Sequence, residues 1–331
     1  HRLSAGPSAG RPIVVKRVAI LNDYQRVALT SADWSVLDDR VDIDVFDQHI
    51  DDPDELVAAL DGFEIVVAMR ERTPFPRSIL ERLDELELLV TTGNRNAAID
   101  AQACADLGIT YCGTGGRVQS TAELTWALIL GCARHLPTEV GNVGSGGWMT
   151  TVGSDLYGAT LGLCGLGRIG AMVADVGKAF GMELIAWSQN LTQERCDELG
   201  VGLVSKEALF ERSDFLTVHL VLSDRTTSLI AEPQLRAMKP TSWLINTSRG
   251  PICDEEALAR ACAEGWIAGA GLDAYGTEPL PVGHPFRELD NVLATPHIGY
   301  VSRNVYEIFF REIVEDIVGH LDGAVVRAIT P

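Results

Sequence analysis

The sequence is poor in basic residues and contains no long apolar run. Lys and Arg number 27 against 46 Asp and Glu, which gives a formal net charge of −19 at pH 7. A chain this acidic is repelled by phosphate backbones, so binding to nucleic acid is disfavoured. No apolar stretch reaches the ~18 residues that a membrane-spanning helix requires, and we therefore expect no membrane partner.

Paired-cysteine motifs are also missing. The seven cysteines are odd in number, include no C-x-x-C pair and mostly stand in apolar stretches such as "GLCGLG" and "LARACAEG". This pattern predicts buried, reduced thiols and a cytoplasmic protein. The first residues, "HRLSAGPSAGRP", lack the apolar centre of a signal peptide and are expected to form a flexible leader.

The spacing of a calcium loop is absent as well. The acidic stretch "DDRVDIDVFDQHIDDPDELVAAL" has no D-x-D-x-D-G pattern, and its acidic residues alternate with apolar ones. Such alternation is typical of the solvent face of a strand followed by the start of a helix. We therefore expect solvated surface there, and no metal site.

What the chain does contain is two series of alternating strand and helix patterns. Its 331 residues suggest two domains of roughly 150 residues each. In the first series, strand patterns such as "RVAILND", "VDIDVFD" and "FEIVVAM" alternate with helix patterns such as "PDELVAALDG" and "FPRSILERLDEL". This alternation predicts an α/β fold with two Rossmann-like domains, each a doubly wound parallel sheet.

A glycine-rich stretch separates the two series near residue 113. A long apolar helix, "STAELTWALILGCARHL", is expected next, with Ser120 or Thr121 as its N-cap. The following "GNVGSGGWMTTVGSDLYG" is expected to be irregular. After the second series the chain ends in the helix pattern "VYEIFFREIVEDIVGHLDG", which is placed to return to the first domain.

The second series opens with the strand pattern "ATLGLCGL", which leads into a glycine turn. Gly165, Gly167 and Gly170 occupy the positions of a G-x-G-x-x-G motif before the helix "RIGAMVADVGKAFG". They would permit a tight turn, a close approach to a pyrophosphate and close helix packing, respectively. We therefore expect dinucleotide binding at residues 165–169, namely Gly165, Leu166, Gly167, Arg168 and Ile169. The alternative is a turn that needs glycine for its shape alone.

The residues after the next strand bear on the choice of dinucleotide. An acidic residue there commonly binds the 2′-hydroxyl of the adenosine ribose of NAD. This chain has "WSQN" instead, with Ser188, Gln189 and Asn190 and no acid. No arginine stands there either, and Arg168 and Arg195 are the nearest candidates. NAD(H) or NADP(H) is expected, with tolerance of NADP and no decision on which is preferred.

Polar residues follow three later strand patterns. Arg249 follows "LINTS", Asp273 and Glu278 follow "AGAGL", and His297 follows "NVLATP". Each has an ordinary structural explanation, such as a surface ion pair or a helix cap. Together they favour catalysis, because ligands of an open parallel sheet bind at the carboxyl ends of its strands.

Chemical roles can be assigned to these four residues. His297 suits the exchange of a hydroxyl proton at neutral pH, and Glu278 beside it would stabilise the imidazolium. Arg249 can bind a substrate carboxylate and polarise the carbonyl. Asp273 can accept a hydrogen bond from the nicotinamide carboxamide.

In this order, the glycine turn, "NTSRG", "LDAYGTEPLP" and "TPHIG" resemble the D-isomer-specific 2-hydroxyacid dehydrogenase family, from about Arg17 to the end of the chain. The resemblance implies Arg249, Glu278 and His297 as the catalytic set. It also implies a flavodoxin-like substrate domain, discontinuous over residues 13–113 and 303–331. The dinucleotide domain, residues 114–302, is inserted into it, and no regulatory domain is expected after the terminal helix.

The resemblance implies further contacts. The substrate carboxylate would meet backbone N–H groups of two loops, with Met69, Arg70, Gly93 and Asn94 as candidates, and Tyr300 would narrow the pocket. A homodimer through the dinucleotide domain is implied, with "GGWMTTVGSDLYG" as the contacting arm. The loop "VHLVLSDRTTSLI" has Val221 where the family usually has proline. The remaining cofactor contacts implied are Thr121, His219, Thr226, Thr247, Asp273 and Gly299.

These features favour the reversible NAD(P)H-linked reduction of a small 2-oxo acid, such as glyoxylate or hydroxypyruvate, to a D-2-hydroxy acid. Formate is disfavoured because position 278 is Glu, where formate dehydrogenases have Gln. The alternatives are a nucleotide-sensing binding protein of the co-repressor type and an inactive paralogue.

Overall fold

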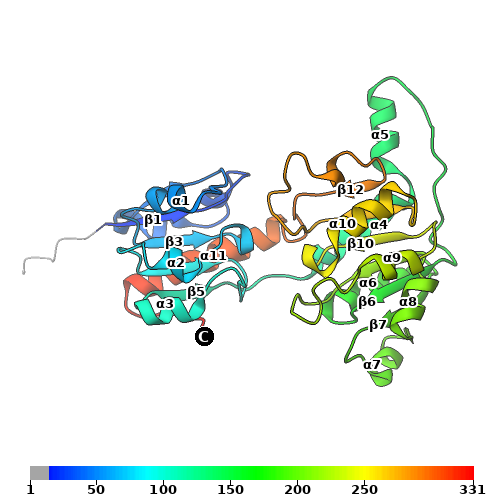
Figure 1. Cartoon of the computed structure of the whole chain (residues 1–331). Helices are drawn as coiled ribbons and strands as arrows, with labels where there is room; N and C mark the ends of the chain where they lie inside the picture. The colour runs from blue at the N-terminus through cyan, green and yellow to red at the C-terminus, as the bar shows by residue number, and fades with distance from the viewer. Residues whose placement is uncertain (1–14) are drawn as a thin grey trace, which may run out of the picture. The chain divides into compact units, whose positions relative to one another are not determined.

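The computed structural model describes residues 15–331 (Figure 1), and the predicted leader at residues 1–12 lies outside them. Contacts between residues divide this part of the chain into two units. One comprises residues 15–116 with 303–331, and the other residues 117–302. Each unit contains one β-sheet whose neighbouring strands all run parallel, with helices connecting them. The predicted fold class is therefore confirmed.

The first unit has a five-stranded sheet in the order β2-β1-β3-β4-β5. Its two apolar strands β3 and β4 are buried along their whole length, as expected of a sheet covered on both faces. Asp42 and Asp44 are exposed on the edge strand β2, in agreement with the predicted solvent face. The strands are β1 (Lys16–Ile20), β2 (Val41–Val45), β3 (Ile65–Ala68), β4 (Leu88–Thr91) and β5 (Thr110–Gly113).

One helix of this unit is much shorter than the sequence predicts. The stretch "FPRSILERLDEL" forms only four residues of helix, α2. After it, Leu83 and Leu86 donate backbone hydrogen bonds to residues three positions earlier, so tight turns replace the helical repeat. Both side chains are still buried in the core, which is why the apolar pattern resembles a helix. The α-helices of the unit are α1 (Pro53–Ala59), α2 (Arg77–Leu80), α3 (Ala101–Leu107) and α11 (Arg303–Leu321).

The terminal helix α11 packs against the first sheet. Its Phe310 ring lies 6.4 Å from the Trp34 ring, and its Tyr306 hydroxyl donates to the Gln25 side chain. Beyond the helix, the Ile329 N–H donates to the carbonyl of Tyr111 in β5. The first unit is therefore built from both ends of the described chain.

The second unit has a seven-stranded sheet in the order β12-β11-β10-β9-β6-β7-β8. Strand β6 pairs with β7 on one side and with β9 on the other, so the direction of strand succession reverses at β6. Open sheets of this kind bind ligands at such a reversal. The strands are β6 (Thr160–Cys164), β7 (Glu183–Trp187), β8 (Gly202–Leu203), β9 (Phe215–Val218), β10 (Trp243–Asn246), β11 (Gly269–Leu272) and β12 (Val292–Ala294).

Two details of the helices in this unit differ from the predictions. Helix α4 begins at Gln119, and Val118 precedes it without a side-chain cap, so neither Ser120 nor Thr121 is the N-cap. The stretch from Gly141, which was expected to be irregular, begins inside a helix, α5. His135 precedes this helix with a left-handed backbone, which turns the chain between α4 and α5. The helices are α4 (Gln119–Ala133), α5 (Leu136–Gly144), α6 (Arg168–Ala179), α7 (Gln193–Glu198), α8 (Lys206–Arg212), α9 (Glu232–Ala237) and α10 (Glu255–Ala263).

Apolar side chains fill the cores of both units, and the cysteines belong to them. All seven cysteines are buried and none forms a disulfide. Burial raises the pKa of Cys104 to about 11 and that of Cys132 to about 12, which keeps these thiols protonated and unreactive. Of the helices within residues 15–331, none combines the length and the apolar character that crossing a membrane would require.

Candidate active site

The glycine turn follows β6, at the reversal point of the second sheet. Gly165 has a left-handed backbone (φ +105°), and a Cβ there would lie 2.7 Å from the His219 carbonyl oxygen. A Cβ on Gly170 would lie 2.3 Å from the Gly165 carbonyl oxygen. Both positions therefore require glycine because backbone atoms approach them closely.

Gly167 differs from the other two glycines. It precedes α6 without a side-chain cap, and a Cβ there would meet nothing within 4 Å. The turn thus presents open space in front of the uncapped N–H groups of a helix, the arrangement that suits a pyrophosphate. The side chains of Leu166 and Ile169 pack in the core, so only their backbone N–H groups are available there.

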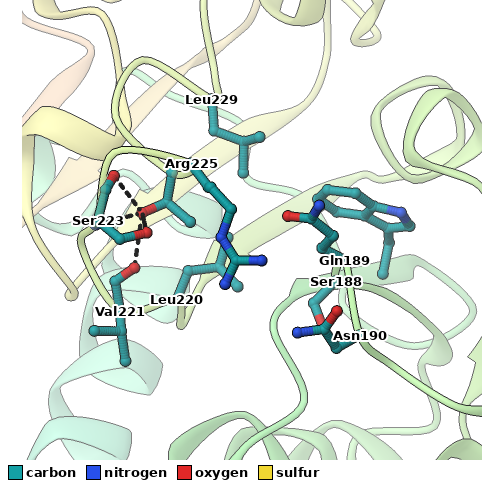
Figure 2. A pocket seen from close by; sticks show the side chains of 10 residues that line it. Ser188, Gln189, Asn190, Leu220, Val221, Ser223, Arg225 and Leu229 are labelled. Atoms are coloured by element: carbon teal, nitrogen blue, oxygen red, sulfur yellow. Dashed lines mark hydrogen bonds between the residues drawn. The ribbon is translucent and has the colours of Figure 1, made fainter.

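A pocket of about 280 Å³ lies beside this turn (Figure 2). Residues 188–190, which follow β7, line one side of it. Residues of the loop after β9 line the other, and one of these is Arg225. Arg168 and Arg195 are the arginines nearest to residues 188–190 in the sequence, but neither lines the pocket. Instead Arg195 pairs with Glu198 at 3.1 Å. The reason is topological: β7 and β9 flank β6, which brings Arg225 opposite residues 188–190.

The loop after β9 is held in place by Thr226. Its hydroxyl donates to the Val221 carbonyl at 2.7 Å and accepts from the Ser223 N–H at 2.8 Å. These bonds fix the loop even though Val221 replaces the usual proline. Thr226 was expected to contact the cofactor, and it both lines the pocket and shapes the loop.

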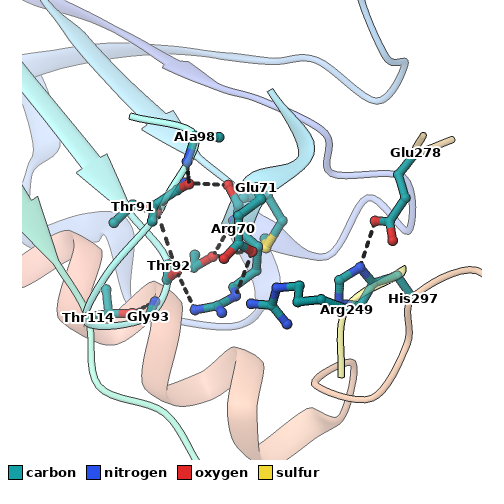
Figure 3. A network of polar contacts seen from close by, with 12 residues as sticks. Arg70, Glu71, Thr91, Thr92, Gly93, Ala98, Thr114, Arg249, Glu278 and His297 are labelled. Carbon is teal, nitrogen blue, oxygen red and sulfur yellow. Dashed lines mark hydrogen bonds and ion pairs between the residues drawn. The ribbon is translucent and has the colours of Figure 1, made fainter. Parts of the chain in front are cut away.

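His297 and Glu278 form a close pair after β12 and β11 (Figure 3). The His297 Nδ1 lies 2.6 Å from Glu278 Oε2, and both side chains are about one-fifth exposed. The other carboxylate oxygen of Glu278 accepts from the Tyr275 N–H at 3.0 Å. With Nδ1 bonded to a carboxylate, Nε2 is the ring nitrogen left to exchange a proton with a substrate. The Tyr300 ring stands edge-on to the imidazole, with centroids 5.5 Å apart.

Asp273 anchors the loop that carries His297. It is 1% exposed, and its oxygens accept from the Ile298 and Gly299 N–H groups, both at 2.8 Å, and from the Thr295 hydroxyl at 2.6 Å. Burial raises the pKa of Asp273 in spite of these bonds. The contact with a nicotinamide carboxamide stays a prediction, while the anchoring explains this aspartate by itself.

Helix α4 is tied to the same loop. The Thr121 hydroxyl donates to the Gly299 carbonyl at 3.2 Å, and the Thr125 hydroxyl donates to the Thr121 carbonyl. Thr125 and Thr247 also share a hydrogen bond of 2.8 Å. Three of the predicted cofactor residues are therefore brought together, through Thr125, which the sequence analysis missed.

Arg249 and His219 complete the strand-end set in this unit. Arg249 follows β10 with an extended backbone, and its carbonyl accepts from the Asn246 side chain at 3.0 Å. The His219 backbone N–H bonds to the Cys164 carbonyl, beside the glycine turn. Burial lowers the pKa of His219 to about 4, so this imidazole is neutral at physiological pH.

The substrate candidates of the first unit lie in loops after β3 and β4 (Figure 3). The Arg70 N–H donates to the Thr92 hydroxyl at 2.9 Å, and the Gly93 N–H donates to the Thr114 hydroxyl at 2.8 Å. Neither N–H is therefore free to bind a carboxylate without sharing its present bond. Met69 is buried and Asn94 is exposed.

Asn96 is the residue of these loops that the sequence analysis missed. Its side-chain amide donates to the Arg70 carbonyl at 2.6 Å and to the Thr91 hydroxyl at 3.0 Å, which joins the two loops. In the same loops, Arg70 (φ +50°) and Gly93 (φ +87°) have left-handed backbones, a conformation that is rare for a residue with a side chain such as Arg70.

Comparisons with known proteins agree with this geometry. The family model described as "D-isomer specific 2-hydroxyacid dehydrogenase, NAD binding domain" matches residues 126–299. The chain is 36% identical to the glyoxylate reductase of Aeropyrum pernix, over 86% of this chain and 88% of that protein. It is 33% identical to the hydroxypyruvate reductase of Thermotoga maritima, over 85% and 92%. The crystal structure of a phosphoglycerate oxidoreductase from Vibrio cholerae has a TM-score of 0.89, 35% identity, and coverage of 94% and 100%.

Proposed function

The chain belongs to the D-isomer specific 2-hydroxyacid dehydrogenase family and is an oxidoreductase that uses a nicotinamide dinucleotide, and we propose that it reduces glyoxylate or hydroxypyruvate. The reduction of a 2-oxo acid is common to the glyoxylate and hydroxypyruvate reductases that it resembles. The names of these two relatives support the choice of a short 2-oxo acid. The observation that carries the proposal is the His297–Glu278 pair at the strand edge that also holds the glycine turn.

In the proposed reaction, His297 is the acid and base. When bound, the dinucleotide supplies or accepts the hydride at C2 of the substrate. During reduction Nε2 of His297 gives its proton to the carbonyl oxygen, and Glu278 stabilises the imidazolium through Nδ1. Arg249 binds the substrate carboxylate and polarises the carbonyl through its planar guanidinium.

The two units are proposed to have separate tasks. Residues 117–302 bind the dinucleotide through the glycine turn and the pocket beside it, and the turn fits that group because Gly167 leaves room in front of α6. Residues of the first unit, with the loops of Arg70 and Gly93, recognise the substrate. Because both N–H groups now bond to threonine hydroxyls, a carboxylate would have to share or replace those bonds.

A homodimer through the second unit is also proposed. The arm that follows α5 exposes large apolar side chains: Trp148 is 70% exposed, Met149 73% and Tyr157 85%. Apolar exposure of this extent is typical of a surface that another protein covers. Sedimentation equilibrium would test the proposal, since a monomer at micromolar concentration contradicts it.

The activity is tested with the purified protein and a panel of 2-oxo acids, following the oxidation of NADH and of NADPH. We expect glyoxylate and hydroxypyruvate to be reduced with a higher kcat/KM than pyruvate or bulkier 2-oxo acids. If no 2-oxo acid is reduced with either cofactor, the chain is a nucleotide-binding protein or an inactive paralogue. If bulkier acids are preferred, the proposed substrate is wrong and the reaction class stands.

A further inference from the structure

The pocket beside the glycine turn is placed to hold the adenosine end of a dinucleotide. In folds of this kind the glycine turn after the first strand meets the pyrophosphate, and the residues after the second strand meet the adenosine ribose. Here residues 188–190 form one wall of the pocket. Trp187, Leu220, Val221 and Leu229 add apolar surface that suits an adenine ring.

The charges around this pocket are unusual for so acidic a chain. None of the residues that line it is Asp or Glu, and Arg225 is its one basic lining residue. A second cation stands close by, because Lys206 Nζ donates to the Leu229 carbonyl and lies 5.8 Å from the centroid of the Trp187 ring. Two cations therefore stand at a pocket whose lining residues include no acid, whereas the chain carries a net charge of −19.

Arg225 is oriented for a ligand. Figure 2 shows its guanidinium directed across the pocket toward Gln189 and Asn190. Within residues 15–331 its guanidinium has no hydrogen-bond or ion-pair partner, although Asp224 is its neighbour in sequence. The loop that carries it is fixed by the Thr226 bonds to Val221 and Ser223, so the arginine extends from a defined backbone.

We propose that Arg225 binds the 2′-phosphate of NADP(H), with Ser188 and Asn190 as additional hydrogen-bond donors, and that the chain therefore prefers NADP(H) to NAD(H). The proposal rests on the proposed binding of a dinucleotide at the glycine turn. A guanidinium binds phosphate through two parallel hydrogen bonds, and a 2′-hydroxyl offers no charge to match it. The absence of an acid after β7 removes the repulsion that would otherwise exclude the phosphate.

The test is a binding measurement that requires no 2-oxo acid. Dissociation constants for NADPH and NADH are measured by tryptophan fluorescence with the wild type, Arg225→Gln and Arg195→Gln. The last variant removes a half-buried arginine that follows the same strand β7 but lies outside the pocket. Loss of a charge-assisted contact predicts that Arg225→Gln weakens NADPH binding about tenfold to hundredfold, with NADH changed less than about threefold.

The result that supports the proposal is this selective loss in Arg225→Gln together with unchanged NADPH binding in Arg195→Gln. Equal weakening of NADPH and NADH would overturn it, because Arg225 would then act on a part that both cofactors share. Tighter NADH than NADPH binding by the wild type would overturn it as well. Competition by 2′,5′-ADP, but not by 5′-AMP, gives a second readout of the phosphate contact. None of these results depends on which substrate is reduced, so the proposed reaction is tested separately.

Discussion

In the second unit, the carboxyl ends of the strands form one edge of the sheet, with β11 and β12 on one side of it and β7 on the other. The side chains that follow these two groups of strands differ in how firmly they are held. At the end formed by β11 and β12, two carboxylates bond to neighbouring groups: the buried Asp273 accepts three hydrogen bonds, and the partly exposed Glu278 bonds to His297 and to the Tyr275 backbone. At the end formed by β7, Gln189 and Asn190 are exposed and line an open pocket.

This difference separates chemistry from choice of cofactor. A proton exchanged in a transition state requires an imidazole held in one position, and the bonds around Asp273 and Glu278 supply that constraint. Recognition of a ribose substituent needs only suitable charge in a pocket that a few side chains define. Substitutions after β11 and β12 should therefore lower kcat, whereas substitutions after β7 should change the preference between NADPH and NADH.

The largest effect is expected from His297→Ala. Removal of the general acid and base should lower kcat about 10²- to 10⁴-fold while leaving the dissociation constant of the dinucleotide within a few fold. Glu278→Gln is the companion variant, and a smaller loss of kcat is expected because the imidazole remains. Steady-state kinetics with saturating substrate measures both, and full kcat in His297→Ala would refute the assignment.

A smaller effect is expected from Asp273→Asn. An amide in this position turns its NH₂ group toward a backbone N–H donor, so at least one buried hydrogen bond is lost, at a cost of about 1–3 kcal/mol. We expect lower thermal stability and a reduced kcat, because the loop that carries His297 loses its anchor.

Asp290→Asn is the matched control for this substitution. It lies between β11 and β12 like Asp273 but is exposed, and surface changes of this kind alter stability by about 0.5 kcal/mol or less. Thermal melts and kcat of the two variants are compared. Equal behaviour of Asp273→Asn and Asp290→Asn would show that the buried bonds do not position the loop.

The residues that follow the strands can be predicted from the sequence better than the hydrogen bonds that hold them in place. Glycines at 165, 167 and 170 follow the buried strand β6, and His297 follows the edge strand β12, so local patterns and the rule for parallel sheets suffice to bring them to one edge. The role of Asp273 as an anchor could not be read in this way. Its partners at 295, 298 and 299 are set by the conformation of a loop, which no periodicity encodes.

Arg225 shows the limit of the argument from neighbouring sequence. The arginines nearest to residues 188–190 in the sequence are Arg168 and Arg195, whereas the arginine in the pocket comes from the loop after β9. Only the strand order, with β7 and β9 on opposite sides of β6, brings it there. The short α2 has a similar cause, because apolar residues can reach a core from successive turns as well as from a helix.

The smallest effect on kcat is expected from Ser188→Asp, which should change the preference between the two cofactors instead. A carboxylate after β7 restores the group that binds a ribose 2′-hydroxyl and repels a 2′-phosphate, so NADPH should lose about tenfold to hundredfold in kcat/KM relative to NADH. Ser188→Asn has nearly the same size without the charge and should leave the ratio of the two kcat/KM values within about threefold. Equal loss with both cofactors would mean that position 188 does not face the 2′ substituent. Because His297 and Glu278 are untouched, kcat at saturating NADH should stay close to that of the wild type. A changed cofactor preference with an unchanged kcat would show that the residues after β7 set the choice of cofactor, while the His297–Glu278 pair sets the rate of the reaction.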